Sequence, residues 1–314
     1  SFLSKPMLRM VNTPQNILDM AEEYIVIIYV FLIFQVLYNL YAGVLRSLGD
    51  SKSPLIFMII SAVTNIILDV VAIAVFHMGV GGAALATVIS QGLSAILSFI
   101  YIKKKFTILK PSKEEMKYDK SLSKVLLRVG LPGAFQYSIT AISCILVQAS
   151  LNNFGSDSVA AYSVANKIEN MVTQFYPALG IGISTFAGQN LGAGELKRVR
   201  KGFRVSVYMN IAYSILAFFI CQFFASPMTK LFVDSNTSSP LVIEESILCV
   251  TTMSIFFIPL GFIFIFRTGC QGLGSGKIPM LSAIIELIAR ATTAFSLPYF
   301  FGFLGICLSN TVSW

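Results

Sequence analysis

The chain of 314 residues is 55% hydrophobic and only 12% charged, which excludes an ordinary soluble domain, where about 25% of residues are charged. Runs of about eighteen or more apolar residues recur along it, and each is long enough to cross a hydrocarbon core of about 30 Å as a helix. Such runs do not fit a membrane barrel, whose strands alternate apolar and polar residues. We therefore predict an all-α integral membrane protein. Its net charge of +8 is explained by basic loops on the cytoplasmic side and does not indicate nucleic-acid binding.

The apolar runs predict nine membrane-spanning segments, after a first stretch at residues 1–12 that has the pattern of a helix end. Each is about as long as a bilayer requires, except the last, which stops at Trp314. We therefore expect about nine or ten spanning segments in a fragment of a longer protein. The nine segments fall at 24–43, 55–76, 79–102, 126–151, 158–188, 204–226, 241–266, 279–300 and 302–314.

One polar hinge occurs twice in the chain. Residues 43–54 join two of the predicted spans, and residues 269–279 join two more, with matching residues 225 positions apart. The matching residues are Leu48, Gly49, Lys52 and Pro54 in the first hinge and Leu273, Gly274, Lys277 and Pro279 in the second. Repeats of this length, built of hydrophobic segments, form the two halves of many membrane transporters.

Basic residues orient the spans, because short loops that carry Lys and Arg stay in the cytoplasm. Alternating the spans from the longest polar stretch places 18 of the 23 Lys and Arg residues on one side. We expect residues 103–124 to form a cytoplasmic linker between an N-terminal lobe at 1–102 and a C-terminal lobe at 125–314. The same side is then expected to hold the two hinges, at 44–54 and 267–279.

Asn65 and Asp69 are the clearest candidates for a functional pair. They lie four residues apart in a predicted span, so a helix places them on one face. An ionisable group inside a bilayer is costly, and it therefore marks a site hypothesis. Asp69 could bind and release a proton, or it could coordinate Na⁺ together with Asn65 and a hydroxyl such as that of Thr87 in the next span. The alternative is an Asp close enough to the outer interface to stay hydrated.

Other polar residues within spans are weaker candidates for a cleft or a substrate site. Glu286 and Arg290 lie four residues apart and are expected to neutralise each other, with substrate binding or gating as the alternative. Glu169 either faces a cleft and attracts cations, or it pairs with a basic residue in a part of the protein outside this chain. Three uncharged residues could line a cavity, although hydrogen bonds between helices are the commoner use of such groups: Tyr38, Asn39 and Gln136.

The sequence gives no sign of an enzyme. The five cysteines lack metal-ligand spacing, and the chain contains no nucleophile elbow and no phosphate-cradling loop. A membrane-embedded enzyme that used Asp69 or Glu286 would need a second catalytic group at the same depth, and the twofold repeat gives it no support. We expect no cofactor, and no metal other than Na⁺ as a coupling ion at Asp69.

These residues resemble the multidrug and toxic-compound extrusion (MATE) family. The resemblance runs through all 314 residues and is densest in Ala42–Pro54, Asn65–Ser90, Gly130–Gly155 and Phe186–Gly194. It implies twelve helices in two pseudo-symmetric six-helix lobes with a substrate cleft between them. By that pattern this chain holds the end of the third helix through part of the twelfth, so its N-terminal lobe is incomplete.

The resemblance also bears on the candidate residues. In family members an Asn and an Asp of the fifth helix, a Thr of the sixth and an Asp of the first form a cation site. Asn65, Asp69 and Thr87 match the first three by helix and by spacing. Some members carry a second site around a Glu of the seventh helix, where this chain has Gln136, so a carboxylate-based site is in doubt there.

The resulting hypothesis is a secondary antiporter that exports cationic, lipophilic drugs and dyes across the cell membrane in exchange for H⁺ or Na⁺. Its expected partners are small organic cations and the bilayer, with no nucleic acid and no obligate protein partner. The alternative is a lipid-linked sugar flippase of the same superfamily, which would favour several cationic side chains in its cleft. Among the basic residues only Lys167 and Arg290 lie within the predicted spans, which counts against the flippase. A fragment without function of its own is a third alternative.

Overall fold

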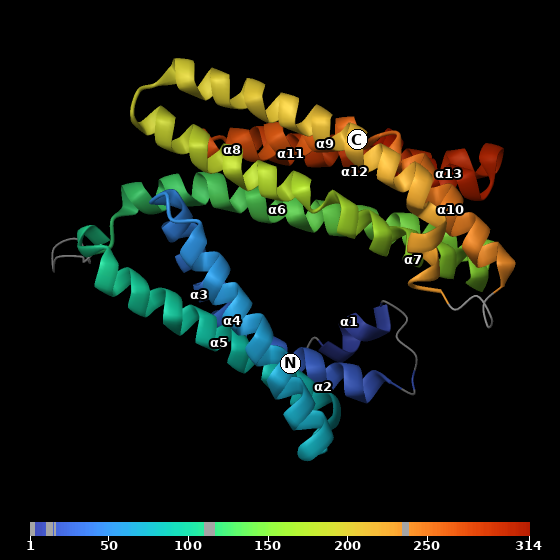
Figure 1. The fold of residues 1–314 in the computed structure, drawn as a ribbon, viewed down its shortest axis with the longest axis horizontal. Helices are drawn as coiled ribbons and strands as arrows, with labels where there is room; N and C mark the ends of the chain where they lie inside the picture. Colours follow the sequence, from blue (N-terminus) through green and yellow to red (C-terminus); the bar gives the residue numbers. More distant parts are fainter. Residues whose placement is uncertain (1–3, 11–14, 16, 110–116, 234–238) are drawn as a thin grey trace. The chain divides into compact units, whose positions relative to one another are not determined.

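The computed structural model describes residues 4–10, 15, 17–109, 117–233 and 239–314, and all regular elements in these ranges are helical. The chain divides into two compact units between Tyr118 and Asp119 (Figure 1). This boundary lies inside the stretch 103–124 that we describe above as a linker. The ends of that stretch are helical, because helix α5 continues to Lys105 and helix α6 begins at Lys120.

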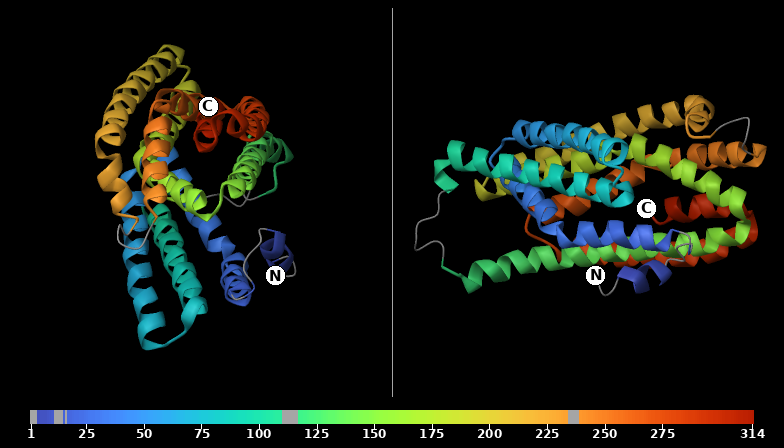
Figure 2. Two further views of the ribbon diagram at one scale, coloured as in Figure 1. Left: turned by 90° about the vertical axis from the view of Figure 1, so that its right-hand side faces the viewer. Right: turned by 90° about the horizontal axis from the view of Figure 1, so that it is seen from below.

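The first unit is built around helix α5. This helix packs against α2, α3 and α4, and Figure 2 shows α4 and α5 side by side. Small residues along α5, such as Gly92, Ser94 and Ala95, are buried and let the neighbouring helices approach closely. The helices of this unit are α1 (Ser4–Met10), α2 (Leu18–Val30), α3 (Leu32–Ser47), α4 (Lys52–Val70), a π-helical turn (Val71–Val75), α5 (Gly79–Lys105) and a 3₁₀ turn (Thr107–Leu109).

The second unit has a larger apolar core between its helices. Among its fully buried side chains are Leu151, Ile168, Tyr176, Phe257 and Ile306, which come from five different helices. The helices of this unit are α6 (Lys120–Leu151), a 3₁₀ turn (Asn152–Phe154), α7 (Ser156–Thr173), α8 (Phe175–Gly192), α9 (Leu196–Lys230), α10 (Pro240–Ser254), α11 (Phe257–Gly272), α12 (Lys277–Phe301) and α13 (Phe303–Val312).

The two hinges have the same backbone geometry. Gly49 and Gly274 both adopt the left-handed conformation, with φ of +84° and +81°, which a glycine adopts without strain. After each glycine the next backbone N–H returns to a carbonyl five residues earlier, from Asp50 to Leu45 over 2.9 Å and from Ser275 to Cys270 over 2.9 Å. These bonds satisfy carbonyls left open at the helix ends. The repeat seen in the sequence is therefore a repeat of structure.

The repeat extends to a bend before each hinge, which the sequence analysis does not show. Helices α2 and α3 meet at 48°, and α10 and α11 meet at 56°. Phe31 and Phe256 each stand directly before the second helix of their pair, 225 residues apart, with φ, ψ of −106°, 17° and −101°, 14°. Pro259 explains the second bend, because it has no N–H to donate to the carbonyl of Ile255. No proline or glycine marks the first bend.

Length and composition make five of the described helices able to cross a membrane, or seven if each bent pair is one span. The protein is therefore a multi-pass membrane protein. The nine or ten segments expected from the sequence also include the stretches that form α1, α13 and the pair α7 and α8. The predicted span at 158–188 contains the break between α7 and α8 at Gln174.

Candidate functional site

The first unit brings Asn65 and Thr87 together on facing helices. Asn65 Nδ2 of α4 donates a long hydrogen bond of 3.5 Å to Thr87 Oγ1 of α5. The Thr87 hydroxyl donates in turn to the carbonyl of Ala83 over 3.0 Å, so its oxygen is turned to accept. Asp69 lies one helical turn beyond Asn65, and its Oδ1 is buried without a hydrogen-bond partner among the described residues.

This arrangement fits a coupling ion. A buried carboxylate oxygen without a partner is costly unless a proton or a cation compensates it. With its Nδ2 donating to Thr87, Asn65 keeps its carbonyl oxygen free to accept, and hard cations take carboxylate, carbonyl and hydroxyl oxygens as ligands. Asp69 alone could hold H⁺, and the three oxygen-bearing side chains together could contribute to holding Na⁺.

Tyr38 and Asn39 lie elsewhere in the first unit. They line a small cavity of about 230 Å³ together with Gln35, Met58, Ser61, Gln91 and Ser94. The Tyr38 hydroxyl donates to the carbonyl of Pro54 over 3.0 Å and so ties α3 to the start of α4. Asn39 Nδ2 donates to the carbonyl of Gln35 on its own helix. Both side chains therefore have local structural contacts in addition to their place at this cavity.

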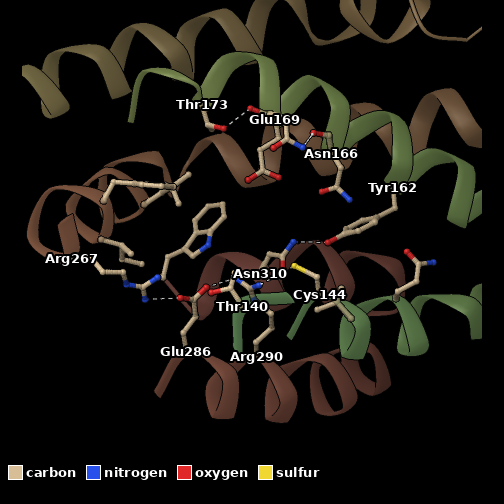
Figure 3. Close-up of a pocket in the computed structure, with 17 residues that line it drawn as sticks. Thr140, Cys144, Tyr162, Asn166, Glu169, Thr173, Arg267, Glu286, Arg290 and Asn310 are labelled. Carbon is tan, nitrogen blue, oxygen red and sulfur yellow. Dashed lines mark hydrogen bonds and ion pairs between the residues drawn. The ribbon is translucent and has the colours of Figure 1, made fainter. Parts of the chain in front are cut away.

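A polar cavity of about 430 Å³ lies within the second unit (Figure 3). Its charged lining residues are Glu169, Arg267, Glu286 and Arg290. The predicted pairing of Glu286 with Arg290 is present, with 2.6 Å between Glu286 Oε1 and Arg290 Nη2. The other carboxylate oxygen of Glu286 lies 2.7 Å from Arg267 Nη2, so one acid is shared between two guanidinium groups. All three side chains are at most 10% exposed.

Arg267 was not among the predicted site residues, because its position in the sequence suggested the second hinge. The structure places it inside α11, on the helix that precedes the hinge, with Glu286 on the helix that follows. Antiparallel helices joined by a short turn bring residues at similar distances from the turn together. Arg267 and Glu286 lie 19 residues apart around the turn, and this relation could have suggested the pair.

Arg290 also connects α12 to two further helices. It donates to Ser143 Oγ of α6 over 2.9 Å and to Ser313 Oγ, just after α13, over 3.3 Å. Gln136 is absent from the lining of this cavity, and it accepts a hydrogen bond of 3.0 Å from Gln271 Nε2 between α6 and α11. Most of the polar groups here therefore hold helices together.

Glu169 differs from the other acid of the cavity. It projects from α7 on the wall across from Arg267 and Glu286 in Figure 3. Within the described ranges no arginine or lysine lies within ion-pair distance of its carboxylate, whereas Glu286 has two such partners. Glu169 is therefore the acid of this cavity that remains available to a ligand.

The repeat relates the polar sites of the two units. Arg290 lies 225 positions after Asn65, at the equivalent place on the helix that follows its hinge. Asn310 lies 223 positions after Thr87. The same offset relates Gly79, where α5 begins, to Gly302, which stands directly before α13. The pair that forms the candidate ion site in the first unit is thus replaced in the second by a guanidinium and an amide. A fixed cation occupies the equivalent place there.

The MatE family model matches residues 1–71 and 131–296 of the chain, which include both hinges and the carboxylates discussed above. The chain belongs to the MatE family. This agrees with the resemblance of its motifs and with the repeat of hinge and bend.

Curated relatives of this MatE chain include transport proteins. It is 31% identical over 261 residues to the "Probable multidrug resistance protein YoeA" of Bacillus subtilis, covering 81% of this chain and 56% of the relative. It is 26% identical over 293 residues to the "FAD transporter" of Shewanella oneidensis, covering 91% of this chain and 63% of the relative. The chain thus spans less than two thirds of the length of these relatives.

Solved structures show the same fold. The outward-facing conformation of a multidrug resistance MATE family transporter of the MOP superfamily matches with a TM-score of 0.90 at 19% identity, over 98% of this chain and 68% of that one. A MOP superfamily transporter from Pyrococcus furiosus also matches with a TM-score of 0.90 at 19% identity, over 98% of this chain and 70% of that one.

Proposed function

We propose that this chain is part of a secondary antiporter that exports cationic, lipophilic compounds in exchange for H⁺ or Na⁺. The observation that carries the proposal is the buried Asp69 oxygen without a partner, one turn from the Asn65–Thr87 hydrogen bond. A buried carboxylate oxygen without a hydrogen-bond partner favours a bound cation or proton that compensates it. It is therefore suited to couple an ion to a change of conformation.

Exchange follows from differential affinity. An ion that binds Asp69 more tightly in one conformation shifts the protein towards that conformation, and a substrate that favours another shifts it back. Neither ligand needs to touch the other, provided that each binds the two conformations unequally. Occupation of Asp69 by the ion then drives release of the substrate, and loss of the ion prepares the protein for the next substrate.

The second unit supports an assignment of ion coupling to the first. At the place equivalent to Asn65 it carries Arg290, a guanidinium side chain. This guanidinium is held by Glu286 and Ser143, so a cation there would face a fixed like charge. In the same cavity Glu169 offers a carboxylate to the cationic centre of a substrate, and Tyr162, Phe264 and Trp314 offer aromatic surface.

A second candidate function is the export of an anionic, phosphate-bearing compound, which includes the lipid-linked sugars of a flippase. It is favoured by the shared acid Glu286, which leaves Arg267 and Arg290 with one excess positive charge. It is also consistent with the similarity to the FAD transporter of Shewanella oneidensis, since FAD carries phosphate groups. Glu169 on the opposite wall opposes this reading, because a second acid in the cavity disfavours an anionic ligand.

Transport by the purified protein in proteoliposomes separates these candidates. We expect efflux of a cationic dye under a proton gradient alone or a sodium gradient alone, and no efflux of FAD. Transport of FAD without transport of the dye would favour the second candidate. No movement of either compound under either gradient, with the protein folded and inserted, would contradict the antiporter.

A further inference from the structure

A groove lies between α8 and α9, apart from both sites described above. Its volume is about 430 Å³. The two helices are joined at one end by a short turn between Gly192 and Leu196 and pack side by side (Figure 1). The groove is lined by Leu179, Gly182, Ile183 and Phe186 of α8 and by Arg198, Lys201, Gly202, Val205 and Ser206 of α9.

Two glycines shape the groove in opposite ways. The ring of Phe186 lies against Gly202, where a Cβ would meet its edge, so glycine is required for this close contact. A Cβ at Gly182 would meet nothing within 4 Å, so the groove is open at that point. The result is an apolar groove with Phe186 packed on one side and, at the exposed Gly182, no side chain.

The lining changes character along the helix axis. Arg198 and Lys201 lie in the first two turns of α9, next to the short turn, and both are exposed. Val205 and Ser206 lie further along α9, and Arg198 and Ser206 are separated by roughly 12 Å at 1.5 Å per residue. In the part of the chain that the structure describes, neither Arg198 nor Lys201 lies within ion-pair distance of an acidic side chain.

We propose that this groove binds an anionic phospholipid. Its acyl chain lies along the apolar part beside Gly182 and Phe186, and its phosphate lies between Arg198 and Lys201. An acyl chain matches an apolar groove on a membrane helix pair, and anionic headgroups bind basic residues at the membrane surface. The first turns of α9 carry five basic residues between Lys197 and Arg204, and by the positive-inside rule we expect such a segment on the cytoplasmic side, where anionic lipid concentrates. The proposal requires only that the chain resides in a membrane.

Binding of a fluorescent phosphatidylglycerol to the purified protein in detergent tests the headgroup contact. The variant Arg198→Gln with Lys201→Gln removes two charges that line the groove. Since each basic residue at the surface contributes about a fivefold gain in binding, we expect affinity to fall roughly 30-fold. The matched control, Lys197→Gln with Arg200→Gln, removes the same charges from the same turns outside the groove and should change affinity less than threefold. Equal losses in the two double variants would overturn the proposal.

A second variant tests the acyl-chain contact without changing any charge. Gly182→Leu fills the open part of the groove, so we expect weaker binding of phosphatidylglycerol with Arg198 and Lys201 intact. Phosphatidylcholine, which has no net charge, should compete poorly, and inorganic phosphate should not displace the lipid at equal concentration. Unchanged binding by Gly182→Leu, or displacement by phosphate alone, would show a simple phosphate site and overturn the proposal.

Discussion

The amide of Asn65 donates a hydrogen bond of 3.5 Å to the hydroxyl oxygen of Thr87, which joins α4 to α5 at the level of the candidate ion site. Asp69 lies on the same face of α4, one turn further along, with a buried oxygen that has no hydrogen-bond partner in the described part of the chain. The relationship places the Thr87 hydroxyl beside Asn65, within the proposed ion site. The contribution of the Thr87 hydroxyl oxygen to ion binding can therefore be measured by substitution.

Thr87→Val removes one oxygen from this site and keeps the shape of the side chain. We expect the concentration of coupling ion for half-maximal exchange to rise by roughly fivefold, because a lost polar contact of this kind is worth about 1 kcal/mol. Thr87→Ser keeps the oxygen and should behave as the wild type. Initial rates of exchange over a range of H⁺ and Na⁺ concentrations measure the effect. A wild-type ion dependence in Thr87→Val would remove Thr87 from the site.

Glu286→Gln leaves Arg267 and Arg290 buried without their shared counter-ion. We expect a loss of about 3–5 kcal/mol in the free energy of unfolding, the usual result of removing one partner of a buried pair. The matched control is Glu169→Gln, which changes an acid of the same cavity that has no basic partner in the described ranges. Chemical unfolding in detergent measures both. Equal stability losses would mean that the shared carboxylate has no special structural role.

Asp50 gives the first hinge a dependence on pH. The Ser53 backbone N–H bond lowers the pKa of this carboxyl to about 2 from 3.8, helped by the Ser53 hydroxyl, Tyr101 and Lys105 and opposed by partial burial. Because the folded-state pKa is the lower one, the ionised carboxylate stabilises the hinge above pH 3.8. This contribution is lost as the pH falls from 3.8 to about 2.

Hydrogen exchange measures this effect at the two hinges of one molecule. After correction for intrinsic rates, protection at the first hinge should fall between about pH 4 and pH 2 in the wild type. Asp50→Asn should show the lower protection already at neutral pH. The second hinge is an internal control, because Ser275 stands at the equivalent position and does not titrate. A parallel loss of protection at both hinges would refute the role of Asp50.

Gly261 permits a close contact between α11 and α9. A Cβ at this position would overlap the side chain of Asn210, which is fully buried and donates to the carbonyl of Ile258 over 3.1 Å. We expect Gly261→Ala to lower the free energy of unfolding by about 1–3 kcal/mol. Gly182→Ala, whose Cβ meets no neighbour, should be neutral or stabilising because alanine favours the helix. Thermal unfolding of the two variants provides the comparison.

The sequence predicted the helical membrane class, the family and the repeat, because apolar runs and the hinge residues are local signals. Glu286 and Arg290 could be paired from their spacing on one helix. Arg267 could not be placed as readily, because its partner lies on another helix across a turn. Neither bend was predicted. Pro259 is a local signal that could have indicated the bend at Phe256, whereas no proline or glycine marks the bend at Phe31.

Gradient-driven export by Asp69→Asn tests the proposed coupling most directly. Proteoliposomes with equal amounts of inserted wild type and variant should be loaded with a cationic dye and given the gradient that drives the wild type. We predict that Asp69→Asn binds the dye in detergent but does not export it under the gradient, because the amide cannot carry a proton and does not neutralise a cation. Export at the wild-type rate by Asp69→Asn would contradict the assignment of ion coupling to Asp69.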